Sequence, residues 1–252
     1  MRLADFRVLS FDCYGTLIDW EHGLWQALQP LLQRGTSPMT RDEVLAAFAR
    51  HESEQQQATP HLPYSELLAE VHRRLAQEWH LSATAADHRR FSQSVNLWPA
   101  FADTPAALRY LQQHYQLVIL SNVDHQSFAG SAAQLGVTCS AVYTAQDIGS
   151  YKPDPANFRY LLDRLAELGH DRSDILHVAQ SLFHDHAPAQ DTGLATAWID
   201  RRGQRGMASS RQSWGATMPP PASARYDFHY PDLAALVQAH QNELADSTAD
   251  RL

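Results

Sequence analysis

The stretch RVLSFDCYGTLIDW, residues 7 to 20, decides the fold of this 252-residue chain. Its first five residues contain an apolar run that predicts a buried strand, and this run ends at Asp12. Gly15 and Thr16 follow and predict a turn. Open α/β sheets bind their ligands at the carboxyl ends of their strands. Asp12 therefore stands at a position where a carboxylate can meet a ligand.

Two different patterns follow this stretch. From about Glu21 to Ser94 the periodicity is helical, and turn signals divide it into about four helices with no strand between them. Beyond Trp98, helices and strands alternate. The predicted strands cover residues 116–121, 140–144, 174–179, 195–200 and 225–230, and the predicted helices cover residues 103–115, 125–135, 154–168, 186–192 and 232–243.

Repeated βα units require a parallel sheet, and the first strand belongs to that sheet by composition. We therefore expect an α/β fold with a Rossmann-like, doubly wound parallel sheet core and an inserted helical cap domain. The core would comprise residues 1–17 and 98–252, and the cap residues 18–97. Residues 203–224, rich in Gly, Ser and Pro, predict a long surface loop, and the last residues are expected to fray.

Composition excludes several classes of function. The net charge is −8 and no run of Lys or Arg occurs, so we expect no nucleic-acid partner. No stretch approaches the roughly 18 apolar residues of a membrane span, and the N-terminus lacks a secretory core, so we expect no membrane association. Cys13 and Cys139 form neither a CxxC pair nor a metal-ligand pattern. A cytoplasmic location is the simplest expectation.

Polar residues with chemical potential stand at or after four of the predicted strands. In chain order they are Asp12 with Thr16, Ser121 with Asn122, Lys152, and Ser181 with Asp185. The carboxyl ends of parallel strands share one edge of a sheet, so these side chains are expected to converge on one crevice.

The motifs FDCYGTLIDW, VILSNVD, SYKPD and HVAQSLFHD occur in an order that resembles the haloacid dehalogenase superfamily. The resemblance covers nearly the whole chain, including the helical cap of the type II subclass. It implies that Asp12 is a nucleophile that forms an ester with the substrate. Lys152 would hold Asp12 ionised, and Thr16 and Ser121 would donate hydrogen bonds. Asp185 would orient and deprotonate the water that cleaves the ester.

Each of these residues also has a structural reading. Asp12, Thr16 and Ser121 could cap strand ends or turns, and Lys152 could be a surface residue of a KPDP turn. Asp185 could cap the helix predicted from His186. The combined order of the motifs favours the functional reading.

Tyr14 separates two reactions. Phosphatases that share the motif have an Asp there, which protonates the departing alkoxide, whereas a halide leaves as a stable anion without a proton. The 2-haloacid dehalogenases of the family carry an aromatic residue at this position, and by that resemblance Tyr14 walls the substrate pocket. Tyr14 could also simply pack beneath the cap.

Gln180 argues against a metal ion. Magnesium-dependent phosphatases of the superfamily read VGDSxxxD, and the first of those acids, a metal ligand, corresponds to Gln180. A neutral amide is a poor substitute for a carboxylate on Mg²⁺. The sequence therefore predicts chemistry with no metal and no cofactor, with Ser181 hydrogen-bonding within its loop.

Asn122 and His184 complete the predicted pocket. By the resemblance, the Asn122 amide is associated with the departing halide, although the residue could equally help to begin the next helix. His184 is expected to line the pocket. The cluster of His184, Asp185 and His186 is not expected to bind metal, because consecutive residues of a helix point in different directions.

Two features depart from the type II pattern. The cap lacks the family's RxKQLEY-like segment, whose Arg grips the halide side of the substrate, and Phe158 replaces a Tyr six places after the motif Lys. Arg50 or His51 could replace the missing Arg, or both could belong to a solvated helix face.

We expect a hydrolase that cleaves the carbon–halogen bond of short 2-haloalkanoates through an aspartyl ester. The alternatives are a Mg²⁺-dependent phosphatase acting on a small phosphate ester and a non-catalytic ligand-binding protein. The expected partner is a small 2-haloacid-like organic acid, and a homodimer is compatible with the fold.

Overall fold

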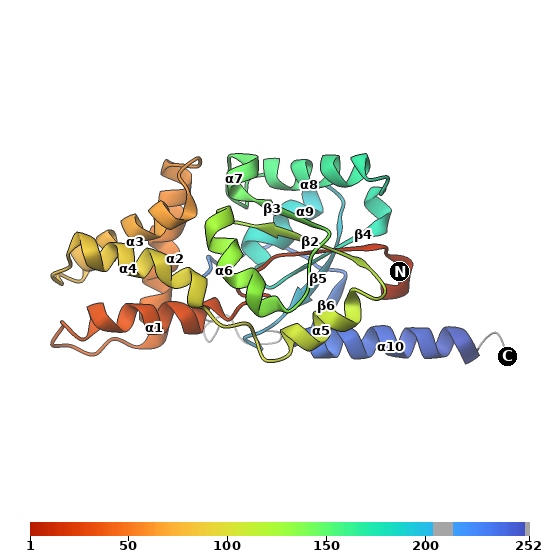
Figure 1. The fold of residues 1–252 in the computed structure, drawn as a ribbon, viewed down its shortest axis with the longest axis horizontal. Coiled ribbons are helices and arrows are strands. Elements are labelled where there is room, and N and C mark those ends of the chain that lie inside the picture. Colours follow the sequence, from red (N-terminus) through yellow and green to blue (C-terminus); the bar gives the residue numbers. More distant parts are fainter. Residues whose placement is uncertain (204–213, 250–252) are drawn as a thin grey trace.

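A computed structural model describes residues 1–203 and 214–249 of the chain. One parallel sheet in the order β3-β2-β1-β4-β5-β6 forms its centre (Figure 1). This confirms the α/β fold with a doubly wound parallel sheet. The strands are β1 (Val8–Phe11), β2 (Gln116–Ser121), β3 (Ala141–Thr144), β4 (Ile175–Ala179), β5 (Ala195–Ile199) and β6 (Phe228–Tyr230).

The strand order makes a switch point at β1. The chain adds β2 and β3 on one side of β1 and then crosses to add β4, β5 and β6 on the other. At such a point the connections leave the sheet in opposite directions, which opens a crevice at the carboxyl ends of the central strands. The segment that follows β1 begins in this crevice.

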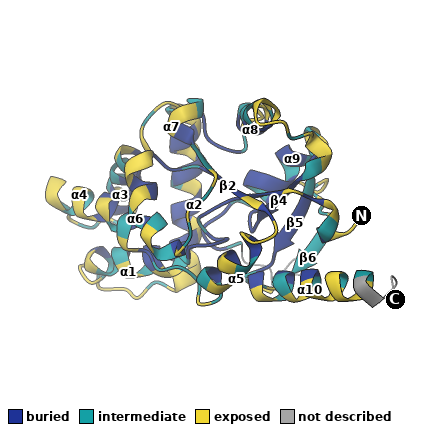
Figure 2. Cartoon of the chain, turned by 45° about the vertical axis from the view of Figure 1, so that its right-hand side comes forward, coloured by how far each residue is buried: buried dark blue, intermediate teal, exposed yellow. Residues whose placement is uncertain are grey.

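Helices cover both faces of the sheet. On one face lie α5 (Thr104–Leu111), α6 (His125–Leu135) and α10 (Leu233–Ala249), and on the other lie α8 (Ala156–Glu167) and α9 (Ala187–Asp191) (Figure 1). The central strands β1, β2, β4 and β5 are buried between these layers, whereas the edge strands β3 and β6 are half-buried (Figure 2). In β2, Val118 and Leu120 pack in the cluster with Phe158 of α8, whereas Leu117 and Ile119 join the opposite cluster. Side chains that alternate along a strand thus fill two separate apolar layers.

Four helices occupy the stretch between β1 and α5. They are α1 (Trp20–Leu32), α2 (Arg41–Ala58), α3 (Tyr64–Glu78) and α4 (Ala85–Gln93), and we call them the inserted helices. They lie together beyond the carboxyl end of β1 (Figure 1). The two connections to the sheet run antiparallel, because the amide of Asp19 donates to the carbonyl of Pro99 (2.7 Å) and that of Phe101 to the carbonyl of Leu17 (3.0 Å).

The structure differs from the sequence prediction in local detail. A short helix, α7 (Ala145–Ile148), follows β3 and was not expected. A π-helical turn, Leu182–His186, precedes α9, so the helical region starts earlier than predicted. Of the predicted loop 203–224, residues 204–213 lie outside the described residues, as do the terminal residues 250–252. Within the described part of the chain, no helix is both long and apolar enough to cross a membrane.

Candidate active site

Asp12 lies directly after β1 and is buried. Its amide donates to the carbonyl of Val178 in β4 (3.1 Å), and the hydroxyl of Thr16 donates to its Oδ2 (2.7 Å). The turn between Asp12 and Thr16 needs glycine, because Gly15 has φ +95° and a Cβ there would lie 2.9 Å from the indole nitrogen of Trp20. The tight turn therefore brings Thr16 beneath the carboxylate.

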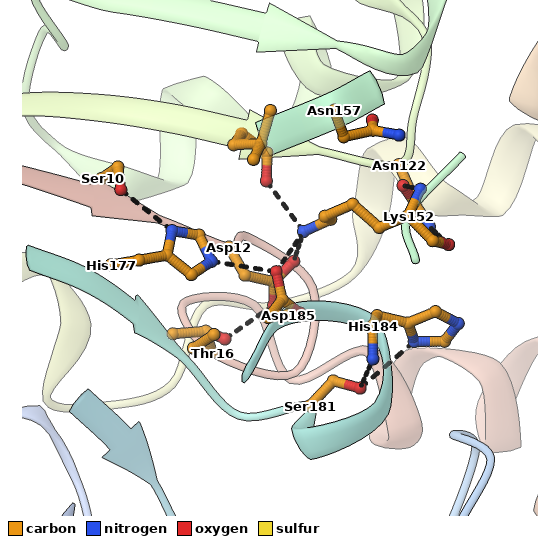
Figure 3. A network of polar contacts seen from close by, with 12 residues as sticks. Ser10, Asp12, Thr16, Asn122, Lys152, Asn157, His177, Ser181, His184 and Asp185 are labelled. Carbon is orange, nitrogen blue, oxygen red and sulfur yellow. Dashed lines mark hydrogen bonds and ion pairs between the residues drawn. The ribbon is translucent and has the colours of Figure 1, made fainter. Parts of the chain in front are cut away.

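Lys152 joins three segments that are distant in sequence. Its Nζ donates to Oδ1 of Asp12 (2.9 Å), to Oδ1 of Asp185 (2.7 Å) and to the carbonyl of Leu120 (3.0 Å) (Figure 3). The side chain is only 1% exposed. A fully buried ammonium ion would be costly without such partners. The surface-lysine interpretation is therefore excluded by this position.

Asn122 holds the backbone of Lys152. Its Oδ1 accepts from the amide of Lys152 (2.7 Å), and its Nδ2 donates to the carbonyl of the same residue (3.0 Å). The residue borders the cavity, but both polar atoms of its amide are engaged in this pair. The structure thus gives Asn122 a positioning role, and the contact of its second amide N–H with a departing halide stays a prediction.

Asp185 points inward from the π-helical turn. Besides Lys152, its Oδ1 bonds to Nε2 of His177 (3.0 Å), and Nδ1 of that ring lies 2.9 Å from the hydroxyl of Ser10 (Figure 3). Ser10 of β1 and His177 of β4 are directly paired in the sheet. The carboxylate does not cap α9, which excludes the structural reading of Asp185. Ser10 and His177 were not among the predicted site residues, and their only signal in the sequence is a histidine inside an apolar strand.

The two carboxylates that share Lys152 are electrostatically unequal. Burial raises the pKa of Asp12, and Lys152 only partly opposes this effect. Burial also acts to raise the pKa of Asp185, but the charges and hydrogen bonds of Lys152 and His177 outweigh it and lower the pKa below the usual range. Burial acts to lower the pKa of Lys152, but the two carboxylates raise it by more than burial lowers it. The pKa is therefore above its usual value, and this residue remains an ammonium ion. Asp185 is thus the more firmly ionised carboxylate.

A cavity of about 40 Å³ lies beside these groups. Three buried polar atoms on its wall have no hydrogen-bond partner among the described residues: Oγ of Ser121, Nε2 of His184 and Oδ2 of Asp185. Buried polar atoms without partners are uncommon in native proteins. They are therefore available to a small polar ligand. All the residues predicted for the site border this cavity except Thr16, which lies behind Asp12.

Tyr14 turns its hydroxyl away from Asp12. The hydroxyl lies 2.7 Å from the Ser131 hydroxyl and 3.3 Å from the carbonyl of Ser127, both in α6. Its ring packs edge-to-face on Trp98, with 5.8 Å between the ring centroids, and borders the cavity. Burial raises the pKa of the phenol well above its ordinary value. Tyr14 thus gives the cavity beside Asp12 an apolar wall and no ready acid.

The HDH residues diverge, as expected for consecutive residues of a helical turn. His184 borders the cavity, whereas His186 bonds to Thr196 and to the carbonyl of Ala179 in the interior. The Ser181 hydroxyl accepts from the amide of His184 (3.0 Å) and lies 3.2 Å from its Nδ1. Burial lowers the pKa of His184 to about 4, so the ring is neutral near neutral pH.

The inserted helices supply the remaining wall of the cavity. Their residues there are Trp20 of α1, Glu52 and Gln56 of α2, and Tyr64 of α3. Arg50 and His51 do not border the cavity, since both bind Glu78 of α3. Glu52 was not among the predicted site residues, because a glutamate in a Gln-rich and Glu-rich helix is typical of a solvated face.

The residues present do not fit a magnesium site of the kind found in the superfamily's phosphatases. Asp12 and Asp185 both bind the same ammonium group, and Gln180 stands where a third carboxylate would be needed. The backbone N–H of Gln180 donates to the hydroxyl of Thr16 (2.9 Å), which fixes the loop, and the side-chain amide provides no anionic oxygen. Mg²⁺ prefers charged oxygen ligands.

Comparisons with known proteins agree with this fold. A family model described as haloacid dehalogenase-like hydrolase matches residues 6–179. The fold is similar to an L-2-haloacid dehalogenase from Xanthobacter autotrophicus with chloropropionic acid covalently bound (TM-score 0.76, 20% identity, 94% of this chain and 98% of that chain). It is also similar to the L-2-haloacid dehalogenase PA0810 (TM-score 0.73, 23% identity, 95% of this chain and 99% of that chain). A further similar structure is a HAD-hydrolase from Bacillus subtilis bound to magnesium (TM-score 0.70, 19% identity, 96% of this chain and 100% of that chain).

No curated protein sequence matches the chain. At these identities the structural likenesses establish the fold and leave the reaction open. The family model, however, spans more than half of the sequence and includes β1, β2, β3 and β4. The chain therefore belongs to the haloacid dehalogenase-like hydrolases.

Proposed function

We propose that the protein is a metal-independent dehalogenase that hydrolyses short 2-haloalkanoates through an ester on Asp12. The observation that carries this proposal is the orientation of Tyr14, whose hydroxyl is bound to α6. No acid at this position can protonate an alkoxide, whereas a halide needs no proton to leave. A cavity of about 40 Å³ holds only a few water molecules and favours a short substrate.

In the first step a carboxylate oxygen of Asp12 attacks C2 of the substrate. The new C–O bond forms as the C–X bond breaks, and the halide departs with the bonding electrons. Thr16 and Lys152 donate to Asp12 and position its carboxylate. The ring of His184 is neutral, and its Nε2 is unpartnered at the cavity. When the hydroxyl of Ser181 or Thr217 donates to Nδ1, the ring proton is on Nε2. This N–H can then donate to the departing halide.

In the second step water attacks the ester carbonyl, which is the carboxyl carbon of Asp12. Oδ2 of Asp185 has no partner among the described residues and accepts the proton from that water. Cleavage of the bond between the carboxyl carbon and the substrate oxygen expels an alkoxide, which takes the proton held by Asp185 and becomes a 2-hydroxy acid. The second proton of the water passes to solvent, and Asp12 is again a carboxylate. Lys152 binds both side chains in the free enzyme and keeps the base beside the nucleophile.

We further propose that the inserted helices act as the cap of this enzyme, since they supply one wall of the cavity. Both cysteines are free, which fits the expected cytoplasmic location. The small organic acid remains the proposed partner, and a homodimer remains a prediction.

Halide release should need no divalent ion. Chloro-, bromo- and fluoroacetate and the 2-halopropionates should be assayed with the purified protein, with and without EDTA. We expect release from at least one of these acids at the same rate in both conditions, because among the described residues no group of metal ligands accompanies Asp12. Phosphate release from small esters that depends on added Mg²⁺, without halide release, would instead favour the phosphatase. Inactivity toward both panels would favour a ligand-binding protein.

Replacing His177 should slow the second step. In His177→Leu, Asp185 loses one of the two donors that orient its carboxylate. We expect kcat to fall about 10- to 100-fold, within the range of a general base's contribution, and the ester on Asp12 to accumulate. Mass spectrometry of the protein during turnover measures that ester.

Ser10→Ala is the matched control, because Ser10 binds only the far nitrogen of the His177 ring. It should reduce kcat much less than His177→Leu does. A His177→Leu enzyme with unchanged kcat and no accumulated ester would contradict the positioning role of His177.

A further inference from the structure

Glu52 is a buried acid that the proposed mechanism does not use. It lies on α2, is 3% exposed, and borders the same cavity as Asp12 and Lys152. The hydroxyl of Tyr64 donates to its Oε1 (2.8 Å), whereas Oε2 has no hydrogen-bond partner among the described residues. Within that part of the chain, no Lys, Arg or His lies within ion-pair distance of Glu52. An isolated carboxylate would be costly in this position.

Burial favours the protonated form of Glu52, and its neighbours among the described residues do not outweigh this effect. Tyr64 of α3 donates to it, which favours the ionised form, and Tyr151, beside Lys152 in the chain, interacts with it electrostatically. Across the cavity, Lys152 is engaged by Asp12 and Asp185, so its charge is already balanced. On α2 itself, the neighbouring charged residues bind partners on α3. Burial raises the pKa of Glu52 to about 8, and the hydrogen bond from Tyr64 only partly opposes this.

We propose that Glu52, carrying its proton on Oε2, donates a hydrogen bond to the carboxylate of the substrate and so selects short organic acids. The proposal rests on the proposed dehalogenase function. Tyr64 holds Oε1 as an acceptor, which leaves Oε2 as the donor. The substrate carboxylate would also reach the unpartnered hydroxyl of Ser121 on the cavity wall.

Charge explains why a neutral acid suits this wall. The cavity already contains two carboxylates and one ammonium ion, and an organic acid adds a further negative charge. An ionised Glu52 would repel the substrate, whereas a protonated one donates without adding charge. Arg50 cannot serve in its place, since it binds Glu78 outside the cavity. A hydrogen bond to a charged group is worth more than one between neutral groups.

The pH dependence of kcat/KM tests this proposal. For the wild type acting on 2-chloropropionate, kcat/KM should be level from pH 6.5 to about 7.5 and should fall up to tenfold per pH unit above about 8 as Glu52 ionises. Glu52→Gln keeps a donor that does not titrate and should remove this fall. Glu52→Leu removes the donor and should raise KM about 10- to 100-fold at pH 7, with a smaller change in kcat.

Glu54→Gln is the matched control, because it removes a carboxylate from the same helix at an exposed position outside the cavity. It should keep the wild-type profile. A wild-type profile that persists in Glu52→Gln, or an unchanged KM in Glu52→Leu, overturns the proposal.

Binding to Asp12→Asn separates this proposal from the proposed function. That variant cannot form the ester, and titration calorimetry with 2-chloropropionate should show binding at pH 6.5 that weakens at least tenfold at pH 9. Such binding without halide release by the wild type would refute the dehalogenase and retain the role of Glu52. Halide release by the wild type, together with binding that is independent of both pH and Glu52, would support the dehalogenase and refute the role of Glu52.

A thermal readout tests the ionisation without any ligand. Because the folded protein holds the Glu52 proton up to about pH 8 and the unfolded chain releases it near 4.5, stability from this group falls as pH rises between those values. The Tm of Glu52→Gln minus that of the wild type should therefore increase over this interval and level off above it. A constant difference would overturn the protonated state that the proposal requires.

Discussion

Asp12→Asn is expected to abolish halide release while the protein stays folded. The amide nitrogen and oxygen cannot replace the carboxylate oxygen that attacks C2, so kcat should fall by about 10⁴-fold or more, as for other enzymes that lose their nucleophile. The substitution removes one of two carboxylates that share a single ammonium ion. It keeps the shape of the side chain, so the Tm should be unchanged or higher. A chloride assay and a thermal scan measure the two effects.

Isotopic labelling of the wild type provides the complementary control. In a single turnover in H₂¹⁸O with enzyme in excess, the heavy oxygen should enter the carboxylate of Asp12, and the product should contain oxygen from the protein. Peptide mass spectrometry locates the label. Heavy oxygen found only in the 2-hydroxy acid would mean that water attacks the substrate directly, and Asp12 would then not be the nucleophile.

Lys152→Met should have the second largest effect, on both stability and activity. Lys152 is 1% exposed and is the shared partner of Asp12 and Asp185. Its removal leaves two buried carboxylates without a cation, which costs about 3–5 kcal/mol. For a domain of this size the Tm should fall by roughly 10 °C. Halide release should be lost, because nothing else holds the nucleophile and the base together.

A double variant separates the two effects. The double variant Lys152→Met with Asp185→Asn has one buried uncompensated carboxylate fewer than the single variant. Its Tm should therefore lie between those of the single variant and the wild type, and it should remain inactive. We expect the single variant to gain stability as the pH is lowered, since protonation then neutralises the carboxylates. A single variant as stable as the wild type at neutral pH would show that the ion pairs do not stabilise the folded state.

The parts of the site that follow from strand order could be predicted from sequence. Asp12, Ser121 and Asp185 each follow a buried run, and parallel strands bring such positions to one edge. The pairing of Lys152 with Asp12 was expected from the family resemblance, and the structure shows that Asp12 and Asp185 share its Nζ. Strand order predicts the convergence on one edge because the segments that contain these residues follow neighbouring parallel strands.

The parts that depend on packing between distant segments could not be predicted. Glu52 looks solvated in sequence, and only the packing of α2 with α1 and α3 buries it beside the cavity. The contact between His177 and Asp185 depends on a π-helical turn, which the residue pattern did not predict. The engagement of the Asn122 amide by Lys152 likewise depends on a backbone segment 30 residues away.

The pairing of Ser10 with His177 also bears on how the central strands align. If β4 slipped by one position along β1, His177 would move to the opposite face of the sheet, and its ring would be buried among apolar groups without the Ser10 hydroxyl to meet it. A sheet misaligned in this way would therefore be destabilised, and it would also lose the contact between His177 and the proposed base. The proposed active site is thus coupled to the strand register, so a chain that folds in the wrong register is expected to be both unstable and inactive.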